Sequence, residues 1–418
     1  MAVISLPRVR HENGGARPLT AWIGATETTI GRIQLTIYRD FKAIGHHWRL
    51  LQSTAACVPA QSFEQAEAWS RIVSQPVGTM PAIVCGRSGS GEIQFIWPFE
   101  VTRTLGLGCL RWIGQDHANY NMGLHSLAFA RQATADDIST LLGEAAGLIG
   151  DVSAAHFEHQ PFDWDGIPNP MARLPHSQSA NTGHSILLEK DFDTLYRNRF
   201  SGKSRNTLKR KERRLGELGE IEIGWAKTPD ERRGLVSLFF EQKRRQFAEQ
   251  GITDAFAEPR IHDFYHEIAA LPSSAYGSLD AGYLKVGGQT VAISCGVFCD
   301  DRFSTLLTSI DTGPTRKFSP GTMLLRHQIK TACVRGLNFF DMGAGDAHHK
   351  GEWCDVTTQL FENFIALEER GYLLTLPLAA VTAAKRNIKT RPGLWAFAQS
   401  VRRNLFGERR PKELPETA

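Results

Sequence analysis

The sequence predicts an α/β (α+β) protein made of two similar units in tandem, each a mixed, mainly antiparallel sheet flanked by helices. At 418 residues the chain is long enough for two domains. Apolar residues alternate in some segments and recur at helical spacing in others. Both halves also share one order of elements: helices, a hairpin turned at glycine, and a further strand. The alternative is two unrelated α/β domains.

The first half begins with residues 1–30, which are rich in Gly, Thr and Arg without clear periodicity and are predicted as a loose leader. An N-terminal unit is predicted over 31–165. Within it IQLTIY (33–38) alternates as a strand does, and the next two apolar-periodic segments predict helices. Turn residues then separate three more apolar runs. The predicted helices lie within 47–56 and 63–73, and the predicted strands are 81–87, 93–101 and 109–114.

A passage rich in Pro and Asn, residues 161–183, marks the predicted boundary between the halves. The C-terminal domain is predicted over 184–375, and a basic C-terminal helix and tail over 376–418. Its predicted elements are a strand at 185–189, a basic helix ending at Leu215, a strand at 221–226, helices at 231–247 and 260–271, and a three-strand meander over 275–310.

The composition is that of an ordinary globular protein, with 42% hydrophobic and 22% charged residues and a net charge of +4. Seven cysteines lie mostly inside apolar runs, which favours a reducing compartment over a disulfide framework. The N-terminal stretch has no apolar core of signal-peptide length, and no later run is long enough to span a membrane. We therefore expect a cytoplasmic location.

The segment TRKFSPGTMLLRHQI, residues 315–329, predicts an anion site at the start of a helix. Ser319 can cap the helix, and Pro320 suits its first position because proline lacks an amide hydrogen. The first amides of such a helix and its dipole attract anions, and pyrophosphate fits that description. The alternative is that Ser-Pro-Gly merely starts a helix.

A second stretch, FFDMGAGDAHHKGEWC at 339–354, follows this helix, and the two resemble the GNAT acyltransferase superfamily. The resemblance is to the CelD/BcsL branch, which is tied to cellulose biosynthesis and related to Fem-type aminoacyl transferases. It covers residues 184–368. The positions that match the branch's closing motif are Asp341, Gly345, Asp346, Lys350 and Trp353.

The resemblance implies acetyl-CoA or another acyl-CoA as cosubstrate, with its pyrophosphate at the helix start. The residues implied to bind it are Arg316, Lys317, Ser319, Gly321, Thr322 and Lys350. Asp341 or Asp346 is the predicted general base. The alternative for Asp341 is a structural carboxylate that caps the following loop.

Substrate-binding residues are predicted in three places. The helix KSRNTLKRKERRL contributes Lys203, Arg205 and Arg210, which would bind the 3′-phosphate of CoA, an acidic substrate or RNA, or form a solvated face. Trp353 lies near the closing motif. GQDHANYN contributes Asp116, His117 and Tyr120, although such a cluster is more often a hydrogen-bonded turn. We expect no metal, because the adjacent His348 and His349 cannot both face one ion.

These patterns predict an acyl-CoA N-acyltransferase that acts on an amine, with a hydroxyl as the alternative acceptor. The acceptor is a small or polysaccharide-linked molecule, and the pathway is cellulose, exopolysaccharide or cell-envelope metabolism. The alternatives are a Fem-like transferase that uses aminoacyl-tRNA, and a catalytically silent accessory module. DNA is not an expected partner. The segment RPGLWAFAQSVRRNLFGERR (391–410) predicts a basic helix that packs on the protein, with contact to an anionic membrane as the alternative.

Overall fold

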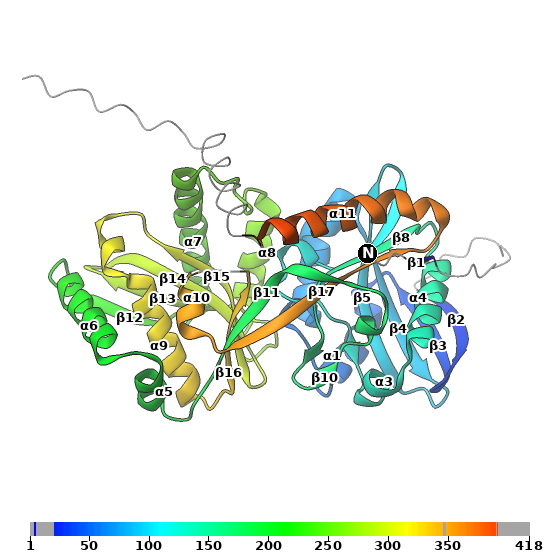
Figure 1. Cartoon of the computed structure of the whole chain (residues 1–418), viewed down its shortest axis with the longest axis horizontal. Coiled ribbons are helices and arrows are strands. Elements are labelled where there is room, and N and C mark those ends of the chain that lie inside the picture. Colours follow the sequence, from blue (N-terminus) through cyan, green and yellow to red (C-terminus); the bar gives the residue numbers. More distant parts are fainter. Residues whose placement is uncertain (1–3, 6–20, 346–347, 390, 392–418) are drawn as a thin grey trace, which may run out of the picture.

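One continuous sheet of fifteen strands runs through the described residues and joins the two units. The computed structural model describes residues 4–5, 21–345, 348–389 and 391 (Figure 1). Along the sheet the strand order is β12-β13-β14-β15-β16-β11-β17-β8-β6-β5-β4-β3-β2, with β1 (Ile4–Ser5) beside β17 and β7 beside β5. A separate hairpin pairs β9 (Asp163–Trp164) with β10 (Ile167–Pro168).

The N-terminal unit packs four helices on its part of the sheet. Its helix α4 begins where a capping box joins Thr134 and Asp137, an arrangement that satisfies amides left free at a helix start. The elements are β2 Ala21–Thr28, β3 Gly31–Tyr38, α1 Phe41–Gln52, α2 Phe63–Trp69, β4 Met80–Ser88, β5 Ile93–Thr104, β6 Leu107–Trp112, β7 Leu124–His125, α3 Leu127–Gln132, α4 Ala135–Ile149 and β8 Ala154–Pro161.

The C-terminal unit repeats this plan. Its longest helix, α7, begins with a capping box between Thr228 and Glu231 and ends at Gly251, whose left-handed backbone suits glycine. The elements are α5 Phe192–Arg199, α6 Gly202–Gly216, β12 Ile221–Trp225, α7 Pro229–Gln250, α8 Pro259–Ala270, β13 Asp280–Val286, β14 Gln289–Cys299, β15 Arg302–Ile310, α9 Pro320–Val334, β16 Phe339–Ala344 and α10 His348–Trp353.

The repeat is visible in both order and pairing. Both units contain a strand, two helices, a three-strand antiparallel meander, a further helix and a last strand, from β3 to β8 and from β12 to β16. The N-terminal unit adds β7 and α3 after its meander. In each unit the last strand lies parallel to the third strand of the meander: β8 beside β6, and β16 beside β15. The predicted tandem arrangement of two units of one plan is thus confirmed.

The next strand of each unit pairs with the other unit. β11 (Ser177–Leu187) follows the N-terminal unit but lies antiparallel to β16, whereas β17 (Val356–Ala366) follows the C-terminal unit but lies antiparallel to β8. β11 and β17 also pair with each other, and Figure 1 shows them crossing between the two halves. The last helix of the described residues, α11 (Tyr372–Lys389), lies along these strands. This exchange of strands makes one structural body of the two units.

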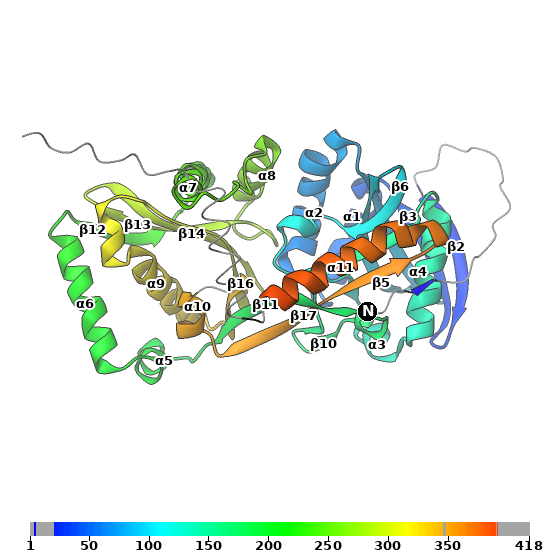
Figure 2. The ribbon, with the colours of Figure 1, turned by 45° about the horizontal axis from the view of Figure 1, so that its top comes forward.

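In the C-terminal unit helices cover both faces of the sheet, as Figure 2 shows with α7 and α9 on opposite sides. Side chains that alternate along β14 separate the two faces. Ile293 and Cys295 pack in a core with Val236 and Phe239 of α7. Ala292 packs instead with α9, in a core that includes Met323 and Leu324. The two faces of this sheet are therefore covered by different helices.

Three predictions about the chain need correction. Residues 21–28 of the predicted leader form β2, which pairs along its whole length with β3. The predicted boundary at 161–183 contains the first part of β11, so no linker separates the units there. The predicted basic tail begins inside α11, which carries exposed apolar side chains such as Leu373 and Val381. Residues 392–418 lie outside the described part, and so does nearly all of the predicted C-terminal helix.

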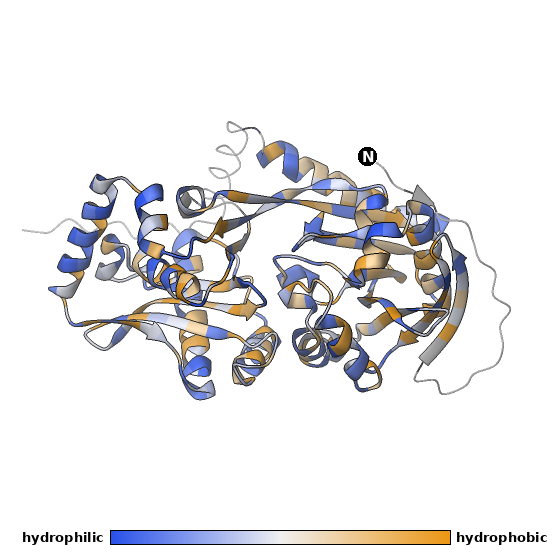
Figure 3. Ribbon diagram, turned by 90° about the horizontal axis from the view of Figure 1, so that it is seen from below, coloured by the Kyte–Doolittle hydropathy of each residue, from blue (hydrophilic) through white to orange (hydrophobic). Residues whose placement is uncertain are grey.

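All seven cysteines lie in the described residues as free thiols, and six of them are buried. Within the described part of the chain, no helix combines the length and the apolar character needed to cross a membrane. Figure 3 colours the ribbon by hydropathy. Helix α6, at the outer end of the C-terminal unit, is mostly hydrophilic.

Candidate active site

A cleft opens where β15 and β16 separate. The two strands pair over only three residues, from Arg302 opposite Phe339 to Ser304 opposite Asp341, although β15 continues to Ile310 and β16 to Ala344. Beyond the paired residues lies a pocket of about 710 Å³. Strands that separate in this way leave backbone donors and acceptors that an extended ligand can bind. Such a gap suits a ligand chain that carries amide groups.

The cleft is bordered by both helical layers. Lys243, Gln246 and Gln250 come from α7 on one face of the sheet, whereas Gly321 and Thr322 come from the start of α9 on the other. Lys243 and Gln246 also donate to carbonyl groups of β15, so their side chains hold α7 against this strand. The cleft therefore connects the two faces of the sheet.

The start of α9 lies at one end of this cleft, but Ser319 does not cap it as the sequence predicts. Ser319 has a left-handed backbone with φ of 61°, and its side chain makes no capping hydrogen bond. Instead its hydroxyl accepts a hydrogen bond of 2.8 Å from the Nζ of Lys211 on α6. The helix begins with Pro320 as predicted, and the neighbouring cation on α6 adds positive charge at its mouth.

The other residues predicted to bind the cosubstrate are partly brought together here. Arg316, Gly321, Thr322 and Lys350 line the cleft. Arg316 forms an exposed ion pair with Glu249 at 3.4 Å. The Nζ of Lys350 donates to three carbonyls, those of residues 343, 344 and 345, and so holds the loop after β16. Lys317 is exposed and lies over the ring of its neighbour Phe318.

A second pocket, of about 580 Å³, lies between α6, α9 and α10. Thr322 lines both this pocket and the cleft, so the two meet at the mouth of α9. The side chains around it combine cations, hydroxyls and aromatic rings. They are Tyr196, Phe200, Lys203, Ser204, Thr207, Leu208, Lys211, Ser319, Thr322, Glu352 and Trp353. This composition suits a phosphorylated ligand with a flat ring.

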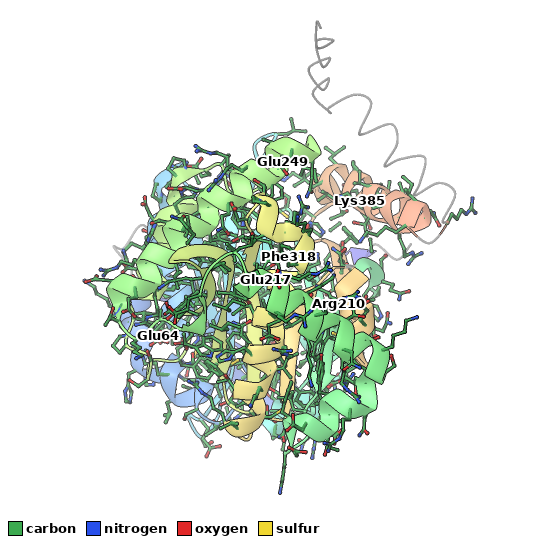
Figure 4. All side chains as sticks on the ribbon, turned by 90° about the vertical axis from the view of Figure 1, so that its left-hand side faces the viewer. Glu64, Arg210, Glu217, Glu249, Phe318 and Lys385 are labelled. Carbon is green, nitrogen blue, oxygen red and sulfur yellow. The ribbon has the colours of Figure 1, made fainter. Side chains whose placement is uncertain are left out.

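The predicted substrate-binding residues on α6 therefore differ in position. Lys203 lines the second pocket. Arg205 points back to its own chain and donates to the carbonyls of Arg197 and Phe200. Arg210 is exposed at the outer end of the molecule, which Figure 4 views directly. Trp353 is buried and stacks on Tyr196 at 5.9 Å, so it forms the wall of the pocket.

Asp341 and Tyr120 form a buried pair that joins the two units. The hydroxyl of Tyr120 donates to Oδ1 of Asp341 at 2.8 Å, and the amide of Gly343 donates to the same oxygen at 2.8 Å. Asp341 has 0% exposure, and within the described part of the chain its Oδ2 has no hydrogen-bond partner. Burial raises the pKa of Asp341, although the charge of Arg302 opposes this shift. A proton can therefore be held here.

The bond from Gly343 to Asp341 is also the loop-capping contact expected of a structural carboxylate. The second predicted base, Asp346, lies outside the described residues. Of the other two members of the Tyr120 cluster, Asp116 forms an ion pair with Arg111 at the surface. His117 lies against Trp69, and burial lowers the pKa of its imidazole. His117 and Tyr120 line a small cavity between the units, whereas Asp116 does not.

Sequence reasoning missed Asn119, which bridges the two separated strands. Its Nδ2 donates to the carbonyl of Thr305 on β15 at 3.0 Å, and its Oδ1 accepts from the amide of Ala344 on β16 at 3.2 Å. Asn119 belongs to the same GQDHANYN segment that drew attention to Tyr120. Its role could not be read from the sequence, because both partners lie in the other unit.

Comparison with known proteins agrees with this geometry. Residues 202–351 match the family model described as Acetyltransferase (GNAT) domain. This part of the chain is thus similar to GNAT-family domains. The match includes α6, α9 and β16, and hence most of the residues around the cleft. No curated protein matches the chain.

Solved structures are similar to this chain over the GNAT-like part and the unit before it. FemX is similar at 13% identity with a TM-score of 0.56, over 79% of this chain and 97% of that one. A conserved protein of unknown function from Bacteroides thetaiotaomicron VPI-5482 follows at 13% identity, 78% and 98% coverage and a TM-score of 0.49. A tandem GNAT protein from the clavulanic acid biosynthesis pathway has 13% identity, 79% and 97% coverage and a TM-score of 0.41. Likeness at this identity concerns the fold alone, and the CelD/BcsL branch stays a prediction.

Proposed function

We propose that the protein is an N-acyltransferase that moves an acyl group from acyl-CoA to an amine. The observation that carries this proposal is the cleft between β15 and β16, which lies in the GNAT-like part of the chain and runs to the mouth of α9. In this proposal the pyrophosphate lies at the first amides of α9, near Arg316 and Lys211. The pantetheine arm then follows the separated strands into the cleft.

The reaction forms a bond between the amine nitrogen and the acyl carbon while the carbon–sulfur bond breaks. The amine loses one proton, and the departing thiolate gains one, so no oxidant or reductant is needed. Asp341 is the first candidate for the base, although it has no exposed surface and Tyr120, whose hydroxyl it holds, is also buried. Asp346 stays the second candidate for the base. Burial raises the pKa of Cys354 to about 12, which argues against a covalent thiolate intermediate.

The acceptor is proposed from the family resemblance and from the open α7 side of the cleft. Lys243, Gln246 and Gln250 offer polar groups there, which suit an amine carried by a small molecule or by a saccharide. A role in exopolysaccharide, cellulose or cell-envelope metabolism belongs to this proposal. A hydroxyl acceptor is the alternative.

A second candidate is a Fem-like transfer from aminoacyl-tRNA. It is favoured by the outer face of α6, where Lys209, Arg210, Arg213 and Arg214 are all exposed and do not line either pocket. Such a face suits phosphate groups of RNA, and binding of this kind weakens steeply with salt. A catalytically silent module is a third candidate, which would bind neither acyl-CoA nor tRNA.

Calorimetric titration with acetyl-CoA tests the first proposal directly, with Gly321→Val as the key variant. A Cβ at this position would lie 2.7 Å from Ile310 and beside the proposed phosphate site, so we expect at least a tenfold weaker affinity, about 1.4 kcal/mol. The control is Gly234→Val, because Gly234 also lies in a helix but its Cβ would meet open space. Equal affinities of the two variants would contradict the phosphate site. Salt-sensitive retention of tRNA without any binding of acetyl-CoA would favour the Fem-like candidate.

A further inference from the structure

A small apolar cavity lies between the two units, directly behind the cleft. It has a free volume of about 30 Å³, which is room for one or two water molecules. Side chains of both units surround it, and most of them are apolar or aromatic. They include Pro59, Trp69 and Ile113 from the N-terminal unit and Phe264, Tyr265 and Leu306 from the C-terminal unit.

Two residues, Asn119 and Leu306, line both this cavity and the cleft. They therefore form the wall between them. Leu306 belongs to β15, whereas Asn119 reaches in from the N-terminal unit and bonds to both strands that border the cleft. The wall is thus built by the contact between units, and neither unit would form it alone.

Asn119 is held tightly in this position. Its two hydrogen bonds use both ends of the side-chain amide, and Gly343 leaves it just enough room. A Cβ on Gly343 would come within 2.6 Å of the Asn119 amide nitrogen, and Gly343 also has a φ of 76°, which side chains rarely adopt. The side chain of Asn119 is therefore a fixed partition.

We propose that Asn119 limits the length of the acyl group that the protein accepts. The inference rests on the proposed function, since it places the acyl end of acyl-CoA at the inner end of the cleft, next to Asn119 and the Tyr120–Asp341 pair. With Asn119 in place, a short acyl group fits and a longer apolar chain meets the amide. Without it, the chain can enter the apolar cavity between the units, where burial of each methylene group is favourable.

The test compares dissociation constants of acetyl-CoA and butyryl-CoA, measured by calorimetry on the full chain without an acceptor. We expect the wild-type protein to favour acetyl-CoA. Asn119→Ala should move the ratio of the two constants toward butyryl-CoA by about tenfold or more, the range that a methylene group contributes in an apolar pocket. Asn119→Asp keeps the volume of the partition but loses the donor to Thr305, so its ratio should stay near that of the wild type.

The matched control is Asn338→Ala. Asn338 is also an asparagine that links the β15 and β16 segments, through a 2.6 Å bond to Asp301, but it lies at their closed end and lines neither space. Leu306→Ala removes the other half of the wall and should move the ratio in the same direction as Asn119→Ala. It keeps the inference testable if Asn119→Ala does not fold.

The outcomes test the inference about Asn119 and the proposed function separately. If Asn119→Ala and Leu306→Ala weaken both ligands equally, Asn119 is only structural and the inference is wrong. The inference is also wrong if the wild-type protein binds butyryl-CoA more tightly than acetyl-CoA, although the proposed function would then stand. If the wild-type protein binds neither ligand, the proposed function itself fails.

Discussion

The hydrogen bond between Tyr120 and Asp341 should stabilise the fold through a contact between the two units. Tyr120→Phe removes a 2.8 Å bond whose two partners are both buried, and it leaves Oδ1 of Asp341 with one donor fewer. A buried hydrogen bond to a carboxyl group contributes about 1.5–3 kcal/mol when the group is charged and about 1 kcal/mol when it is neutral. We therefore expect Tyr120→Phe to lower the free energy of unfolding by about 1–3 kcal/mol.

A double-mutant cycle with Asp341→Asn isolates this contact. Unfolding by urea of the wild type, the two single variants and the double variant gives the coupling energy, which we expect to be at least about 1 kcal/mol. Tyr283→Phe is the matched control, because Tyr283 also donates to a carboxylate, that of Glu222 at 2.6 Å, but at the exposed edge of the sheet. Tyr283→Phe should lower the free energy of unfolding much less than Tyr120→Phe, because exposed hydrogen-bond partners are solvated with or without the bond. A negligible coupling between Tyr120 and Asp341 would refute the reasoning.

The same pair predicts a dependence on pH. Burial raises the pKa of Asp341 in the folded protein above its value in the unfolded chain. A carboxyl group shifted in this direction contributes stability at low pH, below its unfolded pKa, and loses that contribution as the pH rises through the folded pKa. Unfolding measured across this range should therefore show a pH-dependent loss in the wild type that Asp341→Asn lacks. Parallel pH profiles would contradict the shift.

Two further variants test neighbouring features. Burial raises the pKa of Glu100 from 4.5 to about 7, so its contribution of roughly 3 kcal/mol to the free energy of unfolding is lost as the pH rises between these values. Glu100→Gln should flatten the dependence of the free energy of unfolding on pH over that window. An unchanged slope would count against the pKa shift. Lys350→Met removes the Nζ that donates to the carbonyls of residues 343, 344 and 345. The variant should have a free energy of unfolding lower by at least about 2 kcal/mol and should bind acetyl-CoA more weakly. A variant as stable as the wild type would show that water replaces the amine.

Local patterns predicted most elements because each depends on its own residues. The meander over 275–310 and the helix from Pro320 follow from alternation, turn residues and helical spacing, and they lie where expected. β2 was missed because an edge strand needs few apolar residues: Ala21–Thr28 has one neighbouring strand, and Ile23 is 64% exposed. The prediction that Ser319 caps its helix was wrong because the backbone at Ser319 is left-handed, which the sequence of the turn does not reveal.

Pairing across the units could not be predicted in the same way. The sequences of β11 and β17 are typical of strands, but the strands with which they pair, β16 and β8, lie far away in the chain and in the other unit. The candidate site depends on the same long-range geometry. Tyr120 and Asp341 were selected for separate reasons, as part of a polar cluster and as part of a family motif, and only the fold brings them to 2.8 Å. Asn119 carried no signal of its own.

This geometry also explains why the GNAT-like part of the chain cannot be understood from its matched residues alone. The family match ends at residue 351, before β17 begins, yet β17 fills the position between β11 and β8 and so completes the sheet on which β16 lies. β16 in turn carries Asp341 and borders the cleft, while Asn119 and Tyr120 reach it from residues that precede the match. If transfer takes place in this cleft, the N-terminal unit is part of the active site, because it supplies both the inner wall and the partner of the buried carboxyl group.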